Sequence, residues 1–169
     1  STAEVMSNRE AAMKAGLVIP TKEWCLKCHY IKGSHAAVHR LPKLDIDKGM
    51  LAIAHPLPEK SVFKKEGEAE YAQPKQGAKY VGSLNCGTCH KRESMGFQYS
   101  LWRLSAHADA YATLATPRAR EIARAEGVQE DPQQVGECLK CHTTGHASGP
   151  DSFLPSFSKA EGVGCEACH

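Results

Sequence analysis

The sequence predicts a mainly α-helical chain with little regular secondary structure, and two observations lead to this expectation. First, 8 Cys and 9 His occur among 169 residues, of which only 7% are aromatic, so ordinary side chains supply a thin core. Second, the cysteines form four pairs of identical spacing, and a histidine directly follows each pair. The net charge of +2 is too small to indicate a nucleic-acid-binding protein, which carries a clear excess of basic residues. Uncharged stretches such as 49–58 reach only about half the length of a membrane span.

The four repeats read CLKCH at 25–29, CGTCH at 86–90, CLKCH at 138–142 and CEACH at 165–169. This pattern is typical of covalent c-type haem attachment. Two thiols three positions apart lie on one side of a helical turn, where they reach both vinyl groups of one porphyrin, and the next imidazole lies beneath the iron. We therefore expect four haems, attached at Cys25, Cys28, Cys86, Cys89, Cys138, Cys141, Cys165 and Cys168, with iron bound by His29, His90, His142 and His169.

Three other uses of paired cysteines explain the pattern less well. Disulfides need an even number of cysteines but give no reason for a histidine after every pair. Two CxxC units can form a zinc site, yet four adjacent histidines would then have no role. Thioredoxin-like pairs require a βαβ setting that the sequence does not indicate.

Four haems correspond to about 42 residues per haem, so the porphyrins themselves are expected to form the hydrophobic core. Folding should then depend on haem attachment, much as small metal domains depend on their ion. The expected fold class is a multihaem cytochrome c fold, mainly α, with short helices, long connections and little or no sheet.

Two short helices are expected before residue 30. Residues 7–16 begin with a capping box, formed by Ser7 and Glu10, and end at Gly16. A second helix begins near Thr21 and carries the first haem motif.

A third helix is expected over 45–55, with Asp45 as its N-cap. Residues 59–79 contain many charges and few large apolar side chains, which is typical of a linker. The linker divides the chain into an N-terminal one-haem segment, 1–58, and a three-haem segment, 80–169.

The longest helix is expected over 94–115, because apolar residues recur there with the rhythm of one buried stripe. The stripe consists of Phe97, Leu101, Leu104, Ala108 and Tyr111. His107 lies at its edge. A further helix is expected over 117–127, with Thr116 as its cap and its arginines on a solvated face.

A six-coordinate haem needs a second axial ligand, and five histidines remain outside the motifs. His107 is the strongest candidate, because an imidazole at the edge of an apolar stripe needs a partner. His55 ends an apolar helix before a proline and is the next candidate. His35 and His39 lie one turn apart, so we expect one of them, His35, to bind iron. His146 follows a glycine close behind a motif, and its role stays open.

From residue 80 onward, the strings YVGSLNCGTCH, LWRLSAHADAY, ECLKCHTTG and GVGCEACH occur in this order. They resemble the first three haem segments of the cytochrome c-554 family of tetrahaem cytochromes. In that family the histidine of the SAHA-like helix binds a haem attached elsewhere in the chain, which implies this role for His107. The family's second haem site lacks a strong sixth ligand, and the matching motif ends at His142.

Residues 17–58 resemble the family's later portion, in which a distal histidine follows the motif, and this supports His35 and His55 as ligands. The order of segments is then rotated, and relatives continue beyond the motif that here ends at His169. We therefore expect either a longer multihaem protein or stacked subunits that complete each other's haem sites.

Six-coordinate haems pass single electrons with little reorganisation, so the sequence predicts an electron carrier. The expected partners are other redox proteins, or identical subunits in a homo-oligomer or filament with shared haem ligands. The alternative is an enzyme that acts on a small nitrogen compound or peroxide at a five-coordinate haem. No basic-then-apolar leader opens the chain, so we expect a removed secretion signal, and the resemblance implies a periplasmic or extracellular location.

Overall fold

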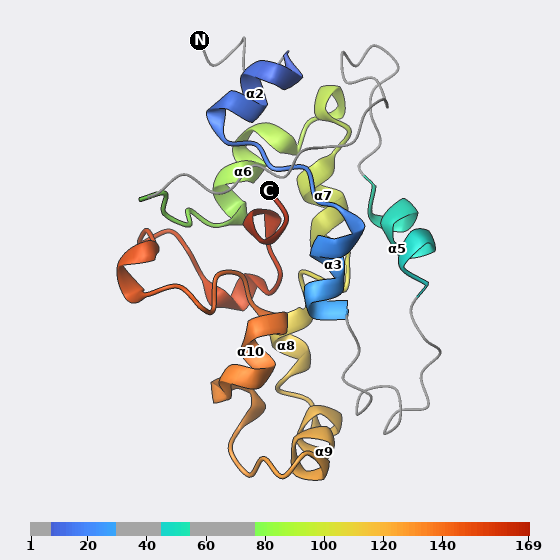
Figure 1. Cartoon of the computed structure of the whole chain (residues 1–169), viewed down its shortest axis with the longest axis vertical. Helices are drawn as coiled ribbons and strands as arrows, with labels where there is room; N and C mark the ends of the chain where they lie inside the picture. Colours follow the sequence, from blue (N-terminus) through green and yellow to red (C-terminus); the bar gives the residue numbers. More distant parts are fainter. Residues whose placement is uncertain (1–7, 30–44, 55–76) are drawn as a thin grey trace.

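The computed structural model describes residues 8–29, 45–54 and 77–169, and this part of the chain is helical and without strands (Figure 1). The α-helices are α2 (Arg9–Ala15), α3 (Lys22–His29), α5 (Ile46–Ile53), α6 (Ser83–His90), α7 (Gln98–Arg103), α8 (Ala110–Thr113), α9 (Pro117–Ala125) and α10 (Gly136–His142). The 3₁₀-helices are η1 (Glu93–Met95), η2 (Pro132–Gln134), η3 (Pro150–Ser152), η4 (Lys159–Glu161) and η5 (Cys165–Ala167). An isolated parallel bridge pairs Tyr80 with Phe153. The mainly helical architecture predicted from the sequence is therefore confirmed.

Helix α2 confirms the first predicted helix, but its cap differs from the prediction. The side chain of Asn8 accepts hydrogen bonds from the backbone N–H groups of Glu10 and Ala11, at 2.9 and 3.2 Å, and the predicted cap, Ser7, lies outside the described residues. The Asn8 amide oxygen reaches these two N–H groups, which lack partners inside the helix. Gly16 ends the helix with a left-handed φ of 112°, as predicted.

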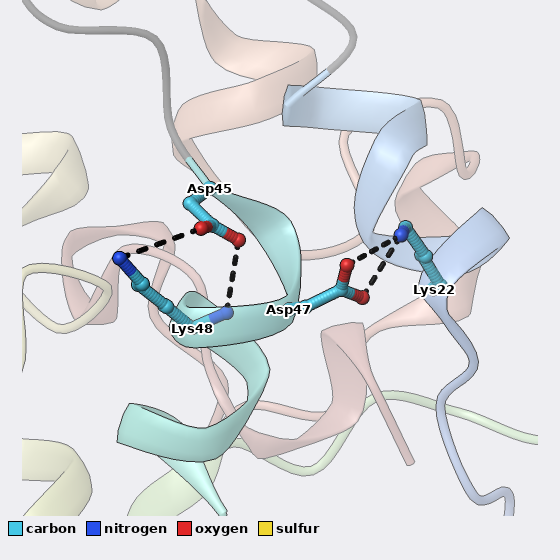
Figure 2. A network of polar contacts seen from close by, with 4 residues as sticks. All are labelled: Lys22, Asp45, Asp47 and Lys48. Atoms are coloured by element: carbon cyan, nitrogen blue, oxygen red, sulfur yellow. Dashed lines mark hydrogen bonds and ion pairs between the residues drawn. The ribbon is translucent and has the colours of Figure 1, made fainter.

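Helices α3 and α5 form where the sequence predicted them, and polar contacts join them. The Asp45 side chain caps α5 by accepting a hydrogen bond from the Lys48 backbone at 3.2 Å. Lys22 Nζ of α3 lies 2.8 Å from Asp47 Oδ1 of α5 (Figure 2). Leu51 on the same helix is 73% exposed, so α5 is held beside α3 while its apolar face stays open.

The prediction of one long helix over 94–115 is wrong, because the segment forms three separate short helices, η1, α7 and α8. Gly96 and Phe97 have left-handed φ values of 70° and 51°, which no helix can continue through. A turn follows α7 and separates it from α8. The predicted buried stripe is also absent from this segment, since Leu104 is 87% exposed and Leu101 46% exposed.

Helix α9 confirms the prediction for residues 117–127. Thr116 Oγ1 accepts a hydrogen bond from the Ala119 backbone at 3.1 Å, and Pro117 occupies the first turn. Arg118 pairs with Glu121 on the exposed face at 2.7 Å, as expected for a solvated helix. This helix lies at one end of the molecule (Figure 1).

The side-chain core of the described residues is thin, as the composition predicted. Its buried apolar members are small or aliphatic: Ala12, Val18, Leu114, Ala119, Ala123 and Leu139. Larger apolar side chains, such as Leu84 at 67% exposure, remain open. Among the described helices, none combines the length and the apolar character that crossing a bilayer requires.

Candidate haem-binding site

The first three CxxCH motifs lie at the ends of α3, α6 and α10, and the fourth begins in η5. Within an α-helix, residues at i, i+3 and i+4 share a face, so each helical motif presents its thiols and imidazole together. The structure describes all eight cysteines, and none of them forms a disulfide. Among the described residues, no three His, Cys, Asp or Glu side chains form a group that could hold a bare metal ion.

The second and fourth motifs lie against each other, although 75 or more residues separate them in the sequence. The Cys86 and Cys165 thiols share a hydrogen bond, which raises the pKa of Cys86 and lowers the pKa of Cys165 to about 7. Ser83 Oγ accepts a hydrogen bond from the Cys165 backbone at 3.1 Å. The start of α6 is therefore fixed to the last motif.

Two carboxylates reinforce this junction. The Glu166 side chain, inside the fourth motif, accepts hydrogen bonds from the backbone of Val81 at 2.9 Å and of Gly82 at 2.8 Å. Glu161 accepts one from the Ser83 backbone at 2.6 Å. Together they satisfy N–H groups at the beginning of α6, which carries the CGTCH motif.

The first motif lies beside the fourth. Trp24 Nε1 donates a hydrogen bond to the Ala167 carbonyl at 2.6 Å, across 143 sequence positions. The pKa of Cys168 is raised to about 11, first by burial and then by the charges of the Cys25 and Cys165 thiols. The N-terminal segment thus packs directly on the C-terminal motif.

The third motif adjoins the first through Cys141 and Cys28. The pKa of Cys28 is raised to about 11, first by partial burial and then by the charge and hydrogen bond of Cys141. These contacts order the four motifs in space as 86–90, 165–169, 25–29 and 138–142.

Three motif imidazoles are oriented by hydrogen bonds at Nδ1. His142 Nδ1 donates to the Ala110 carbonyl and His169 Nδ1 to the Val18 carbonyl, each at 2.8 Å. His90 Nδ1 donates to the Gln98 side-chain oxygen. A proton held on Nδ1 leaves Nε2 as the metal-binding nitrogen, which is the usual arrangement of a ligating histidine. These three motif histidines therefore fit axial iron ligation.

His107 faces His29 of the first motif, with ring centroids 6.0 Å apart and planes inclined by 67°. With metal–imidazole bonds of about 2 Å, two imidazoles on opposite sides of one metal have ring centres about 6 Å apart. Burial lowers the pKa of both rings, which favours the neutral imidazole that binds metal. The pair therefore fits the two axial ligands of one haem iron.

His107 lies in the turn between α7 and α8, not on the continuous helix that was predicted. Its carbonyl accepts hydrogen bonds from the backbone of Val163 at 2.9 Å and of Ala110 at 3.2 Å. Because the Ala110 carbonyl also orients His142, this one turn serves two motifs.

The other distal candidates have separate outcomes. His35, His39 and His55 lie outside the described residues. His146 is exposed, and its ring lies beside Gly136, the first residue of α10. If Gly136 carried a Cβ, that atom would lie 3.2 Å from His146 Nε2.

Sequence reasoning missed the groups that orient the imidazoles and join the motifs. Val18 and Ala110 act through backbone carbonyls, which leave no mark on side-chain chemistry. Glu166 was visible as a charge inside CEACH, and Gln98 as a polar residue eight positions after His90, but neither has a partner that spacing identifies.

One comparison with known proteins gives a match. The family model described as cytochrome c554 and c-prime matches residues 85–169, which include three of the four motifs and His107. No curated protein and no solved structure matches the chain.

Proposed function

The chain belongs to the cytochrome c554 and c-prime family of c-type cytochromes, which carry covalently bound haem, and from this premise we propose that it transfers single electrons through four haems. Each CxxCH thiol pair would hold one porphyrin. The proximal iron ligands would be His29, His90, His142 and His169. The haem iron supplies a one-electron couple when bound.

The observation that carries this proposal is the His29–His107 pair, with its centroid separation of 6.0 Å. Two protein ligands close both axial positions, so an iron held there has no position left for a substrate. We also propose His35, which follows the first motif, and His55, which precedes a proline, as distal ligands of further haems. Such ligation favours an electron carrier over an enzyme.

The contacts between motifs support passage of electrons along the chain. Each motif touches the next through a cysteine pair or a backbone contact, in the order 86–90, 165–169, 25–29 and 138–142. Haems attached to neighbouring motifs would lie close to one another. The packed backbone between them limits reorganisation, because the orienting hydrogen bonds at His142 and His169 end on main-chain carbonyls.

The surroundings of this function follow from the family and the sequence. We propose an N-terminal one-haem segment, 1–58, a linker, 59–79, and a three-haem segment, 80–169. The electron partners would be other redox proteins or neighbouring copies that share haem ligands in an oligomer or filament. A periplasmic or extracellular location fits a family of covalent haem proteins.

Intact mass spectrometry of the purified protein tests the haem count, with the polypeptide mass plus four haems as the expected result. Cys86→Ser combined with Cys89→Ser should remove one haem from that mass. A bare polypeptide mass contradicts the proposal.

Carbon monoxide added to the reduced protein tests the ligation. No binding is expected if all four irons are six-coordinate. Binding at one haem per chain, together with a high-spin ferric signal, would support the enzyme alternative.

A further inference from the structure

Two half-buried carboxylates stand at the junction of the second and fourth motifs. Glu166 is held by the backbone N–H groups of Val81 and Gly82, and Glu161 by that of Ser83, at distances of 2.6–3.1 Å. Both side chains are only partly exposed. Charges in such positions are less screened by water and salt than charges on the surface.

The carboxylates also act on the thiols that would carry the haems. The pKa of Cys86 is raised by its hydrogen bond with Cys165, by burial, by the Cys165 charge and, after these, by the Glu166 charge. The pKa of Cys165 is lowered mainly by the hydrogen bond with Cys86, and the Glu161 charge opposes this. The hydrogen bonds to Val81, Gly82 and Ser83 hold both carboxylates at the start of the helix that carries the second motif, so their charges would also act on an iron bound at this junction.

The other charges close to the motifs differ from these two carboxylates in sign or in exposure. Lys27 and Lys140 occupy the position before the second cysteine in the first and third motifs. Lys27 Nζ lies 3.5 Å from the centre of the Trp24 ring. Glu23 and Glu137 nearby are exposed, as are Lys91 and Arg92 after the second motif, so solvent screens all of these more strongly than the junction carboxylates.

Resting on the proposed function, we propose that Glu161 and Glu166 make the haems at 86–90 and 165–169 the low-potential pair of the chain. Negative charge stabilises ferric over ferrous iron, because the ferric centre carries one more positive charge. Electrons would then pass from this pair to the haems at 25–29 and 138–142. In each step one ferrous iron is oxidised and its ferric neighbour is reduced; a reduced redox protein supplies the first electron, and an oxidised redox protein accepts it from the last haem.

The size of the effect follows from Coulomb's law. One charge about 10 Å from an iron, at an effective dielectric constant of about 20, changes the electron affinity roughly tenfold. A tenfold change corresponds to about 59 mV for a one-electron couple.

The test is a spectroelectrochemical redox titration of the haem-loaded full chain. Glu166→Gln removes the charge but keeps an oxygen that can accept the Val81 and Gly82 bonds. It should raise the two lowest midpoint potentials by about 59 mV each, which is a tenfold gain in electron affinity. The two highest midpoint potentials should change less. Glu166→Asp, which retains the charge, should keep the low midpoints. Glu137→Gln is the matched control, because it neutralises an exposed carboxylate directly before Cys138.

Unchanged low midpoints in Glu166→Gln would overturn this inference, as would an equal rise of all four steps or the same rise in the control. If Glu166→Gln loses haem, Glu161→Gln is judged by the same criterion. Glu161 accepts one hydrogen bond at this junction, from the Ser83 backbone, so its replacement disturbs the structure less. Wild-type protein without covalent haem or reversible reduction would overturn the proposed function itself. Four reversible haems with unshifted low steps would overturn only the potential order.

Discussion

Gly162 lies against the turn that carries His107, and replacing it with alanine tests whether this turn positions the imidazole. Gly162 has φ 72° and ψ −134°, a backbone conformation that residues with a Cβ rarely adopt. A Cβ there would lie 2.5 Å from the His107 carbonyl oxygen and 2.9 Å from that of Ala108. Both neighbours are backbone atoms, so no side-chain rotation can relieve the contact.

The expected cost has two parts. A non-glycine residue in this backbone conformation costs about 1–3 kcal/mol. Moving the His107 carbonyl weakens the hydrogen bond that Val163 donates to it at 2.9 Å, which costs about 1 kcal/mol more. We therefore expect Gly162→Ala to lower the free energy of unfolding by about 2–4 kcal/mol. The displaced turn should also separate His107 from His29.

Denaturant unfolding of the haem-loaded protein measures the first effect, and the high-spin fraction in the visible spectrum measures the second. Gly149→Ala is the control, because Gly149 has φ −67° and open space around its Cβ position. The control should match the wild type in both measurements. A Gly162→Ala protein that is as stable and as low-spin as the control would refute the assigned role of this turn.

Three further results are expected. His107→Ala should open one axial position, so that the reduced protein binds one more carbon monoxide per chain than the wild type, whereas the exposed His146→Ala should bind no more than the wild type; an equal increase in both would argue against His107 as a ligand. Thr116→Ala should lower the free energy of unfolding by about 1 kcal/mol in a denaturant titration, because Ala119 N–H loses its cap at 3.1 Å, and an unchanged midpoint would contradict this. Chain produced without haem attachment should show no cooperative thermal transition by circular dichroism, since its side-chain core is thin; a sharp transition would show that haem is not needed for folding.

Local signals predicted the helices well where each end has its own determinant. Asp45 and Thr116 cap α5 and α9 as expected, and Gly16 ends α2. The segment 94–115 failed, because its apolar spacing satisfied a helix while Gly96 and Phe97 took left-handed conformations. Periodicity reports which face could be buried, but it does not report that the chain must turn to meet another segment.

The candidate site divides in the same way. Haem chemistry was readable because each attachment unit is five consecutive residues, so its thiols and imidazole need no distant partner to come together. His107 was identified as a candidate, but its pairing with His29 depends on a turn fixed by Val163 and Gly162.

The sequence by itself determined the cofactor chemistry and the local helix ends, because both depend on residues a few positions apart. Only the tertiary structure decided which motifs are neighbours, which carbonyls orient their imidazoles, and where the carboxylates of Glu161 and Glu166 lie. The bond from His169 to Val18 spans 151 positions. Contacts of that range follow from the path of the whole chain, and no local pattern encodes that path.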